Sequence, residues 1–435
     1  MQKTINVLSV VLLLIFVGLS AYSQNSISPF SRYGIGDLHH YAYGRTAAMG
    51  GATLGSRHST QINTANPASY SSSDSLSFVI FDFGTDASFS SYSTSSNKLN
   101  TDHSVLRYFA TKILLKKWLG AAIGIQPFSD MDYQFELHEN TSTTGNVYHQ
   151  YIGDGTSSKV FLGASAKLTK GLSVGANLNY YCGQLNQYSN FAYQTSDQHH
   201  ESETLKTELR DFSLSYGLQY DFRLNNEKFL TLGLTLENET DLRVLCSDCS
   251  IQTITKGTQL VMDTTKCTKK EKSTLKLPST LGIGLSYTKL NKFEFSADYY
   301  YAAWSNSTFY GQTEEYITNQ SRISAGIEFT PGSSTTSSYF KRMSYRAGYY
   351  SGNTNLKLNN QPVKDSGISF GVGLPIPKSK STANLAVEFG NRGNLTDNLI
   401  KEKYTKVSLY FTFANFWSRR AKADGLQDAA QETAN

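Results

Sequence analysis

Apolar and polar residues alternate one by one through much of the chain after residue 75. In Arg322 to Phe329, RISAGIEF, apolar side chains occupy every second position, and Arg, Ser, Gly and Glu occupy the others. The same alternation recurs in 293–301, FEFSADYYY, and in 406–413, KVSLYFTF. A period of two places successive side chains on opposite faces of a β-strand. These segments are therefore predicted strands with one apolar and one polar face.

The pattern predicts about fourteen strands, an even number as in single-chain bacterial barrels. Their expected ranges are 75–92, 102–114, 119–137, 156–169, 172–190, 204–221, 228–245, 274–289, 292–305, 318–331, 338–355, 364–376, 382–392 and 401–416. Many reach ten residues or more, which is enough to cross a bilayer at a barrel's tilt. Strands of a soluble β-sandwich, the alternative, are usually about five or six residues long. The expected fold class is all-β, a transmembrane antiparallel β-barrel.

The links between these strands alternate in length. Very short links, such as Lys170-Gly171 and Leu290-Asn291, alternate with longer ones at about 138–155, 191–203, 246–273 and 306–317. Short periplasmic turns and long external loops are typical of outer-membrane barrels. The long links are therefore expected to be extracellular loops, and both ends of the barrel are expected on the periplasmic side.

Where the alternation is most regular, charged residues fall on the polar face. They include Glu294, Asp298, Arg322, Glu328, Glu388 and Lys406. In a closed barrel they face the interior, whereas a shift of one residue would turn them into hydrocarbon, at about 2–4 kcal/mol for a basic residue near the midplane. We therefore expect these six side chains to face the lumen.

Composition agrees with an outer-membrane location. The chain has 28 Tyr and 24 Phe, yet its mean hydropathy is only −0.36. Many aromatics with a polar average suit strands that alternate between lipid and lumen. The net charge of +5 comes without a basic patch or aromatic RNA-binding motif, so no nucleic-acid partner is expected.

The first residues have the layout of a secretory signal peptide. Lys3 precedes an apolar run from Val7 to Leu19, and small residues follow at Ala21 and Ser23. This layout predicts cleavage before about Gln24. The expected organisation is a signal peptide at 1–23, a separate N-terminal segment at 24–74, the barrel at 75–417 and a periplasmic tail at 418–435.

The segment before the first strand carries two short motifs. AAMGGATLG (47–55) contains Gly50 and Gly51, which suit a compact turn, and NTANPASY (63–70) contains Asn66, Pro67 and Ala68. Pro67 has no backbone N–H and pushes Asn66 out of the helical region, so a regular element ends there. The aromatic and aliphatic residues of the whole 24–74 segment argue against a disordered leader. We expect a plug inside the barrel.

These motifs, followed by a barrel of this strand count, resemble the FadL-type outer-membrane transporters of long-chain fatty acids and other hydrophobic compounds. The resemblance implies that residues 24–74 form a hatch ended by Asn66, Pro67 and Ala68. It also implies passive uptake of a hydrophobic small molecule, without enzyme activity or a cofactor. PorV-like proteins of the same superfamily are instead accessory barrels in protein secretion or assembly. A transporter should have a continuous apolar pocket, and an accessory barrel a filled interior.

Enzymatic and metal-site motifs are weak. Gly171 to Gly175 forms a literal G-x-S-x-G around Ser173, but a nucleophile elbow requires a strand-to-helix turn, and this sequence alternates like a strand. Adjacent histidine pairs at 39–40 and 199–200 cannot converge on one ion as i, i+4 helical pairs do. We therefore expect neither catalysis nor a metal.

Four cysteines could form disulfides in an exported protein. They are Cys182, Cys246, Cys249 and Cys267, and four cysteines allow three pairings. We expect at least one disulfide to pin the 246–273 link. The lysine-rich stretch 265–276 in that link is either a solvated surface or a contact for anionic lipopolysaccharide of the outer membrane.

Overall fold

The computed structural model describes residues 28–40, 42–72, 78–141, 145–193, 199–256, 259–332, 334, 336–377, 379–396 and 399–416. The predicted signal peptide and C-terminal tail lie outside these residues. The first half of the sheet comprises β2 (Phe78–Ser93), β3 (Lys98–Lys116), β4 (Leu119–Asp130), β5 (Tyr133–Thr141), β6 (Gly145–Lys167), β7 (Leu172–Tyr193), β8 (His199–Arg223) and β9 (Lys228–Glu237). These strands follow one another around the barrel.

The second half continues from β10 (Thr240–Lys256) and β11 (Gln259–Leu277). It then contains β12 (Thr280–Lys289), β13 (Phe293–Ala302), β14 (Gln320–Phe329), β15 (Ser344–Leu358), β16 (Gln361–Pro375), β17 (Thr382–Gly393) and β18 (Lys401–Phe416). Before the barrel lie the short strand β1 (Asp37–Leu38) and 3₁₀ turns at Pro29–Arg32, Gly44–Met49 and Pro67–Ser71. A further 3₁₀ turn at Trp304–Asn306 and the short helix α2 (Tyr339–Arg342) lie in links.

The sheet closes into a fourteen-strand antiparallel barrel. β18 pairs with β2 from Lys401↔Ser93 to Phe416↔Phe78, which joins the last strand to the first. Three pairs of labelled strands, β4 with β5, β9 with β10, and β11 with β12, each form one barrel strand interrupted by two residues. Closure pairs the backbone groups that an open sheet would expose to lipid. The predicted fold class is confirmed.

The two faces of the wall differ as the alternation predicts. Large apolar side chains such as Leu232, Ile327 and Phe389 point outward and are exposed. Their sequence neighbours Thr231, Glu328 and Glu388 point into the lumen. No helix among the described ranges is long and apolar enough to span a bilayer.

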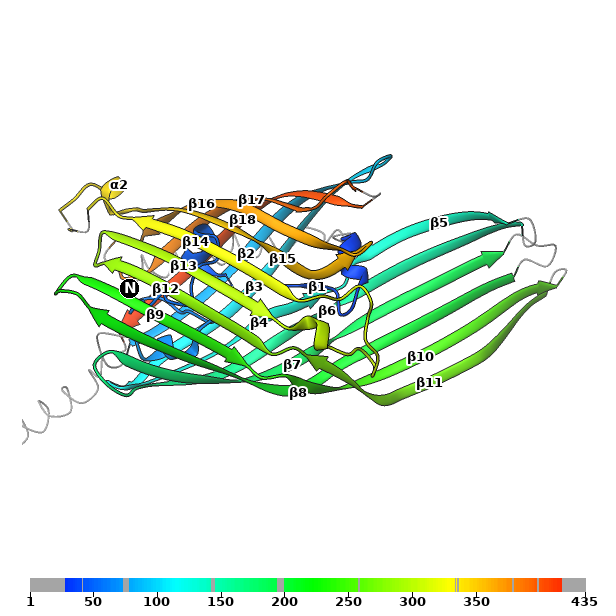
Figure 1. Cartoon of the computed structure of the whole chain (residues 1–435), viewed down its shortest axis with the longest axis horizontal. Coiled ribbons are helices and arrows are strands. Elements are labelled where there is room, and N and C mark those ends of the chain that lie inside the picture. The colour runs from blue at the N-terminus through cyan, green and yellow to red at the C-terminus, as the bar shows by residue number, and fades with distance from the viewer. Residues whose placement is uncertain are drawn as a thin grey trace, which may run out of the picture.

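One side of the wall extends far beyond the other (Figure 1). β6, β7 and β8 have 23, 22 and 25 residues, whereas about 9–11 tilted residues cross a bilayer. The predicted extracellular loops at 138–155, 191–203 and 246–273 are therefore wrong, because these segments continue the strands as the hairpins β5–β6, β7–β8 and β10–β11. The fourth, 306–317, is a link with only isolated bridges.

Candidate functional site

The N-terminal segment, defined here as residues 28–72, runs along the inside of the barrel. At the extracellular end, the Ser28 backbone N–H donates to the Asp132 carbonyl at 2.8 Å, and β1 pairs with the end of β4 through Leu38↔Ser129. At the periplasmic end, the Ser71 N–H donates to the Ser165 hydroxyl at 3.2 Å. The segment therefore contacts the wall near both ends of the lumen.

The Asn66-Pro67-Ala68 motif starts the last turn of this segment. The Asn66 side chain accepts from the Ala68 N–H at 3.1 Å and donates to the Leu54 carbonyl at 3.0 Å. It is an N-cap for the 3₁₀ turn Pro67–Ser71, with Pro67 at the first position. A Cβ at Gly217 of β8 would lie 2.2 Å from the Asn66 Oδ1, so the motif fits directly against the wall.

Gly50 and Gly51 form a second contact with the wall. Both have positive φ, 65° and 83°, in the region that favours glycine. The Gly50 N–H donates to the Ser369 hydroxyl at 2.9 Å. A Cβ at Gly348 of β15 would lie only 2.0 Å from the Gly50 nitrogen. This turn requires glycine on both sides of the contact.

Close backbone contact of this kind recurs around the barrel. Glycines on nine strands would each place a Cβ 2.0–2.6 Å from an atom of the N-terminal segment: Gly120, Gly163, Gly175, Gly217, Gly233, Gly284, Gly326, Gly348 and Gly371. Side chains would push the segment away from these strands. The wall is therefore shaped to hold the segment in one position.

Buried ion pairs join the segment to the wall. The Arg45 guanidinium lies 2.9 Å from the Glu294 carboxylate and 3.0 Å from that of Glu328. Arg346 of β15 pairs with Glu328 at 2.5 Å, and His58 contacts Glu294. Arg45 and Glu294 are almost completely buried. Removing one partner from such a buried cluster leaves an uncompensated charge.

The other predicted lumen charges have separate partners. Asp298 accepts from the backbone N–H groups of Thr53 and Leu54 at 2.5 and 2.8 Å. Arg322 donates to the Gly50 carbonyl at 3.3 Å. Lys406 and Glu388 pair with each other at 3.7 Å. The structure thus brings Glu294, Asp298, Glu328 and Arg322 to the N-terminal segment, and it leaves Glu388 and Lys406 in a wall-to-wall pair.

Several basic residues at this interface have no distinctive sequence signal. Lys112 of β3 donates to the carbonyls of Gln61 and Ser72 at 2.7 and 3.1 Å. Arg392 pairs with Asp37 at 2.5 Å. Arg107 occupies a bulge in β3 and contacts Asp86 and His39, both at 2.6 Å. The sequence could have identified these three residues as contacts of the N-terminal segment only from their basic side chains on predicted lumen-facing positions.

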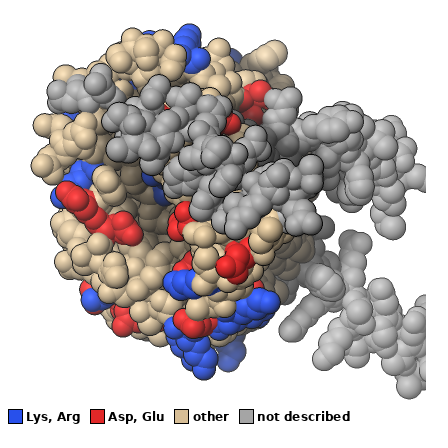
Figure 2. All heavy atoms as spheres, turned by 90° about the vertical axis from the view of Figure 1, so that its right-hand side faces the viewer, with Lys and Arg blue, Asp and Glu red and all other residues tan. Residues whose placement is uncertain are grey.

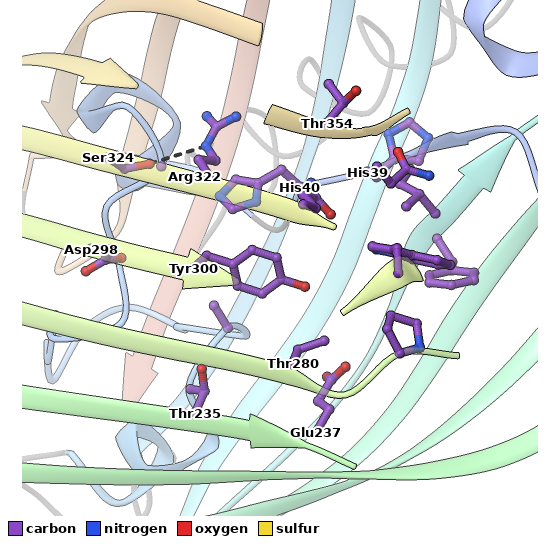
Figure 3. A pocket seen from close by; sticks show the side chains of 18 of the residues that line it. His39, His40, Thr235, Glu237, Thr280, Asp298, Tyr300, Arg322, Ser324 and Thr354 are labelled. Atoms are coloured by element: carbon purple, nitrogen blue, oxygen red, sulfur yellow. Dashed lines mark hydrogen bonds between the residues drawn. The ribbon is translucent and has the colours of Figure 1, made fainter. Parts of the chain in front are cut away.

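Two cavities lie between the N-terminal segment and the wall of the barrel. They measure about 200 and 230 Å³ and both adjoin residues 37–40 of the N-terminal segment. Figure 3 shows the first cavity, where His40, Tyr300 and Arg322 lie close together and Arg322 contacts Ser324. Burial lowers the pKa of His40 well below its usual range, and the nearby Arg322 adds to the effect. The imidazole is therefore neutral at pH 7.

Both cavities have linings of mixed polar and apolar side chains, and apolar residues pack at the extracellular end. Asp, Glu, His and Arg side chains contribute to the lining of both. An apolar cluster that includes Phe30, Ile35, Trp304, Phe309 and Ile317 packs across the barrel at that end. Neither cavity has the continuous apolar lining expected of a passage for hydrophobic molecules.

The cysteines lie on β7, β10 and β11, and the serine of the G-x-S-x-G motif faces the N-terminal segment. Cys249 and Cys267 are disulfide-bonded and join β10 to β11, while Cys182 and Cys246 are free. Ser173 lies inside β7, is fully buried and accepts a hydrogen bond from Arg57 at 2.7 Å. Within the described part of the chain, no group of three His, Cys, Asp or Glu side chains could hold a metal.

Solved structures that share this fold include a channel, a transporter and a FadL homologue. The CymD monoaromatic hydrocarbon channel is 12% identical with a TM-score of 0.52, over 87% of this chain and 97% of that one. The Pseudomonas putida toluene transporter TodX is 14% identical with a TM-score of 0.53, over 88% and 100%. A Pseudomonas aeruginosa FadL homologue is 9% identical with a TM-score of 0.52, over 87% and 98%. The chain therefore has a FadL-type fold. Its closed barrel with large apolar side chains exposed on the outer face is the architecture of an outer-membrane protein.

The family assignment comes from the sequence as a whole. No curated protein matches the chain. The model of one family, described as BamG, matches residues 1–424, nearly the entire chain. The chain belongs to the BamG family.

Proposed function

We propose that this protein is an accessory barrel subunit of an outer-membrane protein secretion or assembly complex. The observation that carries the proposal is the filled lumen. The N-terminal segment packs directly against glycines on nine strands and is joined to the wall by buried ion pairs. Residues 28–72 then serve as a permanent plug, and Asn66, Pro67, Ala68, Gly50 and Gly51 fix its shape.

The energetics of the plug argue against a frequently opened path. To leave the lumen, the segment would have to separate Arg45 from Glu294 and Glu328, which are at 2.9 and 3.0 Å. Breaking a buried pair costs about 3–5 kcal/mol when one partner is left uncompensated. A weakly bound hydrophobic molecule of millimolar affinity supplies only about 4 kcal/mol in total. One broken pair would therefore offset all of that binding energy, and leaving the lumen would also break the hydrogen bonds from Thr53 and Leu54 to Asp298.

The extended extracellular sheet offers a surface for a partner protein. It contains β5, β6, β7, β8, β10 and β11. Over the described residues β5 pairs only with β6, and β11 pairs with β10 apart from one bridge, Leu275↔Phe309. Exposed edge strands are templates for pairing with another chain. Val261 and Met262 of β11 are 47% and 70% exposed, which adds apolar surface to this edge.

Positive charge on β11 affects which partners can bind at this edge. Lys266, Lys269, Lys270 and Lys272 of β11 are exposed, and Figure 2 shows basic side chains gathered at the lower edge of this end of the molecule, where β10 and β11 lie in Figure 1. Lysines on an edge strand oppose indiscriminate pairing. Lys266 and Lys270 form ion pairs with Asp248 and Glu208 of the same sheet. Lys269 and Lys272 are left to favour acidic groups on a partner.

Purification in a mild detergent at native expression level tests the proposal. We expect the protein to elute with partner proteins in fixed stoichiometry by native mass spectrometry. A variant with residues 247–270 replaced by Asn-Gly keeps the paired residues Cys246↔Glu271 and shortens the hairpin. It should lose partners but retain the heat-modifiable gel shift of a folded barrel. A wild-type protein that elutes alone would contradict the proposal.

Uptake of a hydrophobic small molecule is the second candidate function. It is supported by the fold shared with hydrocarbon and toluene channels, and by apolar surface from Trp304 and Leu54 in the cavity of about 200 Å³. Proteoliposomes loaded with a fatty-acid-binding probe would measure entry of a radiolabelled long-chain fatty acid. Entry above that of empty liposomes, and faster after deletion of residues 42–57, would favour uptake over the accessory role.

A further inference from the structure

A groove of about 590 Å³ lies on the wall where β17, β18, β2 and β3 approach the extracellular side. Its two sides are Phe389 and Phe89, which are 47% and 53% exposed. Thr405 lies between them, because the register pairs Phe389 with Thr405 and Thr405 with Phe89. With strands about 4.8 Å apart, the two rings stand about 10 Å from each other across a small side chain.

The outward-facing residues of the groove change from apolar to polar along the strands. Toward the membrane interior, the next outward row is Val387, Val407 and Ala87, whose side chains are apolar and small. Toward the extracellular side, the next row is Asn391, Lys403 and Ser91. Aromatic side chains in barrels mark the boundary between hydrocarbon and head groups. The Phe389 and Phe89 row is therefore at the outer interface.

Three ammonium groups lie above this boundary. The row beyond Lys403 contains Lys401 and Lys98, joined through Ser93. None of the three lysines has an ion-pair partner within the residues that the structure describes, and the only acid on these outward rows of β2 and β3 is Asp102, beside Phe89. The groove is apolar toward the membrane interior and ends in these three lysines, for which the described residues provide no ion-pair partner. This arrangement suits a lipid that has an acyl chain and a phosphate group.

We propose that this groove binds one phosphate-bearing lipid of the outer leaflet. An acyl chain lies over Val387 and Val407 between the two phenylalanine rings, and the phosphate contacts Lys403, Lys401 and Lys98. Neither the plug nor the extended sheet takes part, so the inference is independent of the proposed function. The site would hold the membrane on the side of the barrel where the strands do not extend.

Binding of lipid A to the delipidated full-length protein in a neutral detergent tests the site. We expect the triple variant Lys98→Gln, Lys401→Gln, Lys403→Gln to bind more weakly, by about fivefold for each lysine if each contributes as basic residues do at anionic membranes. The matched control, Lys266→Gln, Lys269→Gln, Lys272→Gln, removes the same charge from β11 and should bind normally. Equal loss in the two variants, or no loss in either, would overturn the proposal.

A second variant tests the acyl part of the site. Thr405→Phe fills the floor between Phe389 and Phe89 without changing charge, and it should weaken lipid A binding about tenfold while the gel shift of the folded barrel is kept. Phosphatidylglycerol in place of lipid A distinguishes a phospholipid from lipopolysaccharide as the natural source. Full competition by millimolar inorganic phosphate would show a free-anion site and refute binding of a lipid.

Discussion

Arg45 is the residue on which the buried charge balance of the lumen depends. It faces both Glu294 and Glu328, and its side chain is only 3% exposed. Arg45→Met should therefore lower the free energy of unfolding by about 3–5 kcal/mol, because two carboxylates lose their shared cation. The temperature at which the barrel loses its gel shift would measure the change.

Two comparisons separate charge from general damage. Arg223→Met removes an exposed arginine that donates a hydrogen bond to Asn226 at 2.8 Å and has no ion pair within the described ranges, and it should have little effect. Adding Glu294→Gln to Arg45→Met should recover part of the loss, because it removes a carboxylate that has lost its arginine, whereas Glu328 keeps its pair with Arg346. If the double variant were less stable than the single one, the charge argument would fail.

Gly348 tests the close fit between wall and plug. A methyl group there would lie 2.0 Å from the Gly50 nitrogen and 2.1 Å from the Met49 carbonyl carbon, both backbone atoms. Gly348→Ala should destabilise the packing of the N-terminal segment by about 1–3 kcal/mol. Protease cleavage within residues 42–57 should increase, whereas Gly332→Ala, where the nearest atom is a Ser337 hydroxyl at 3.0 Å, should leave it unchanged.

The sequence could predict which charges face the lumen but not what they meet. Glu294 and Glu328 alternate with apolar residues, so their face follows from period two alone. Their partner Arg45 is 249 residues away from Glu294 in a segment without periodicity. Its place depends on how the segment packs, and local sequence holds no information about that packing.

At the level of elements, the strands crossing the membrane were predictable and their extracellular extensions were not. All fourteen predicted segments overlap strands of the barrel. Within the bilayer, lipid on one side and the lumen on the other enforce alternation. Beyond it, both faces of β6, β7 and β8 meet polar surroundings, and the pattern fades although the backbone ladder continues. The 138–155, 191–203 and 246–273 segments were mistaken for loops for this reason.

The disulfide should stabilise the β10–β11 hairpin specifically. Cys249 and Cys267 are separated by 18 residues, and closing a loop of that size contributes about 3 kcal/mol in the chain-entropy account. Trypsin should cut after Lys266, Lys269, Lys270 or Lys272 much faster in Cys249→Ser than in wild type. Reductant should have the same effect on wild type and none on the variant. Cys182→Ser, at a free cysteine, serves as the control.

At the level of the whole molecule, closure and filling have different origins. Closure follows from the need to pair every backbone group in lipid, so strand count and alternation were enough to predict it. The sequence motifs around Asn66 and Gly50 suggested a plug, but they did not indicate that an apolar cluster around Phe30 and Trp304 covers the extracellular end. That cluster combines the N-terminal segment with links far apart in the chain, which only the closed barrel brings together.

Ion conductance provides the test at this scale. Because the N-terminal segment also contacts β2, β3, β17 and β18 and so meets the wall on every side, the wild-type protein in a planar bilayer should show no steady current. Deletion of residues 42–57 removes Arg45 and exposes Glu294, Asp298 and Glu328 to the lumen. Water would then fill a polar, net-negative interior, and stable cation-selective currents should appear. The variant with the shortened β10–β11 hairpin should remain silent, since its plug is intact. Steady wild-type currents that persist after Gly348→Ala would mean that ions pass outside the plug, and the accessory role would lose its main support.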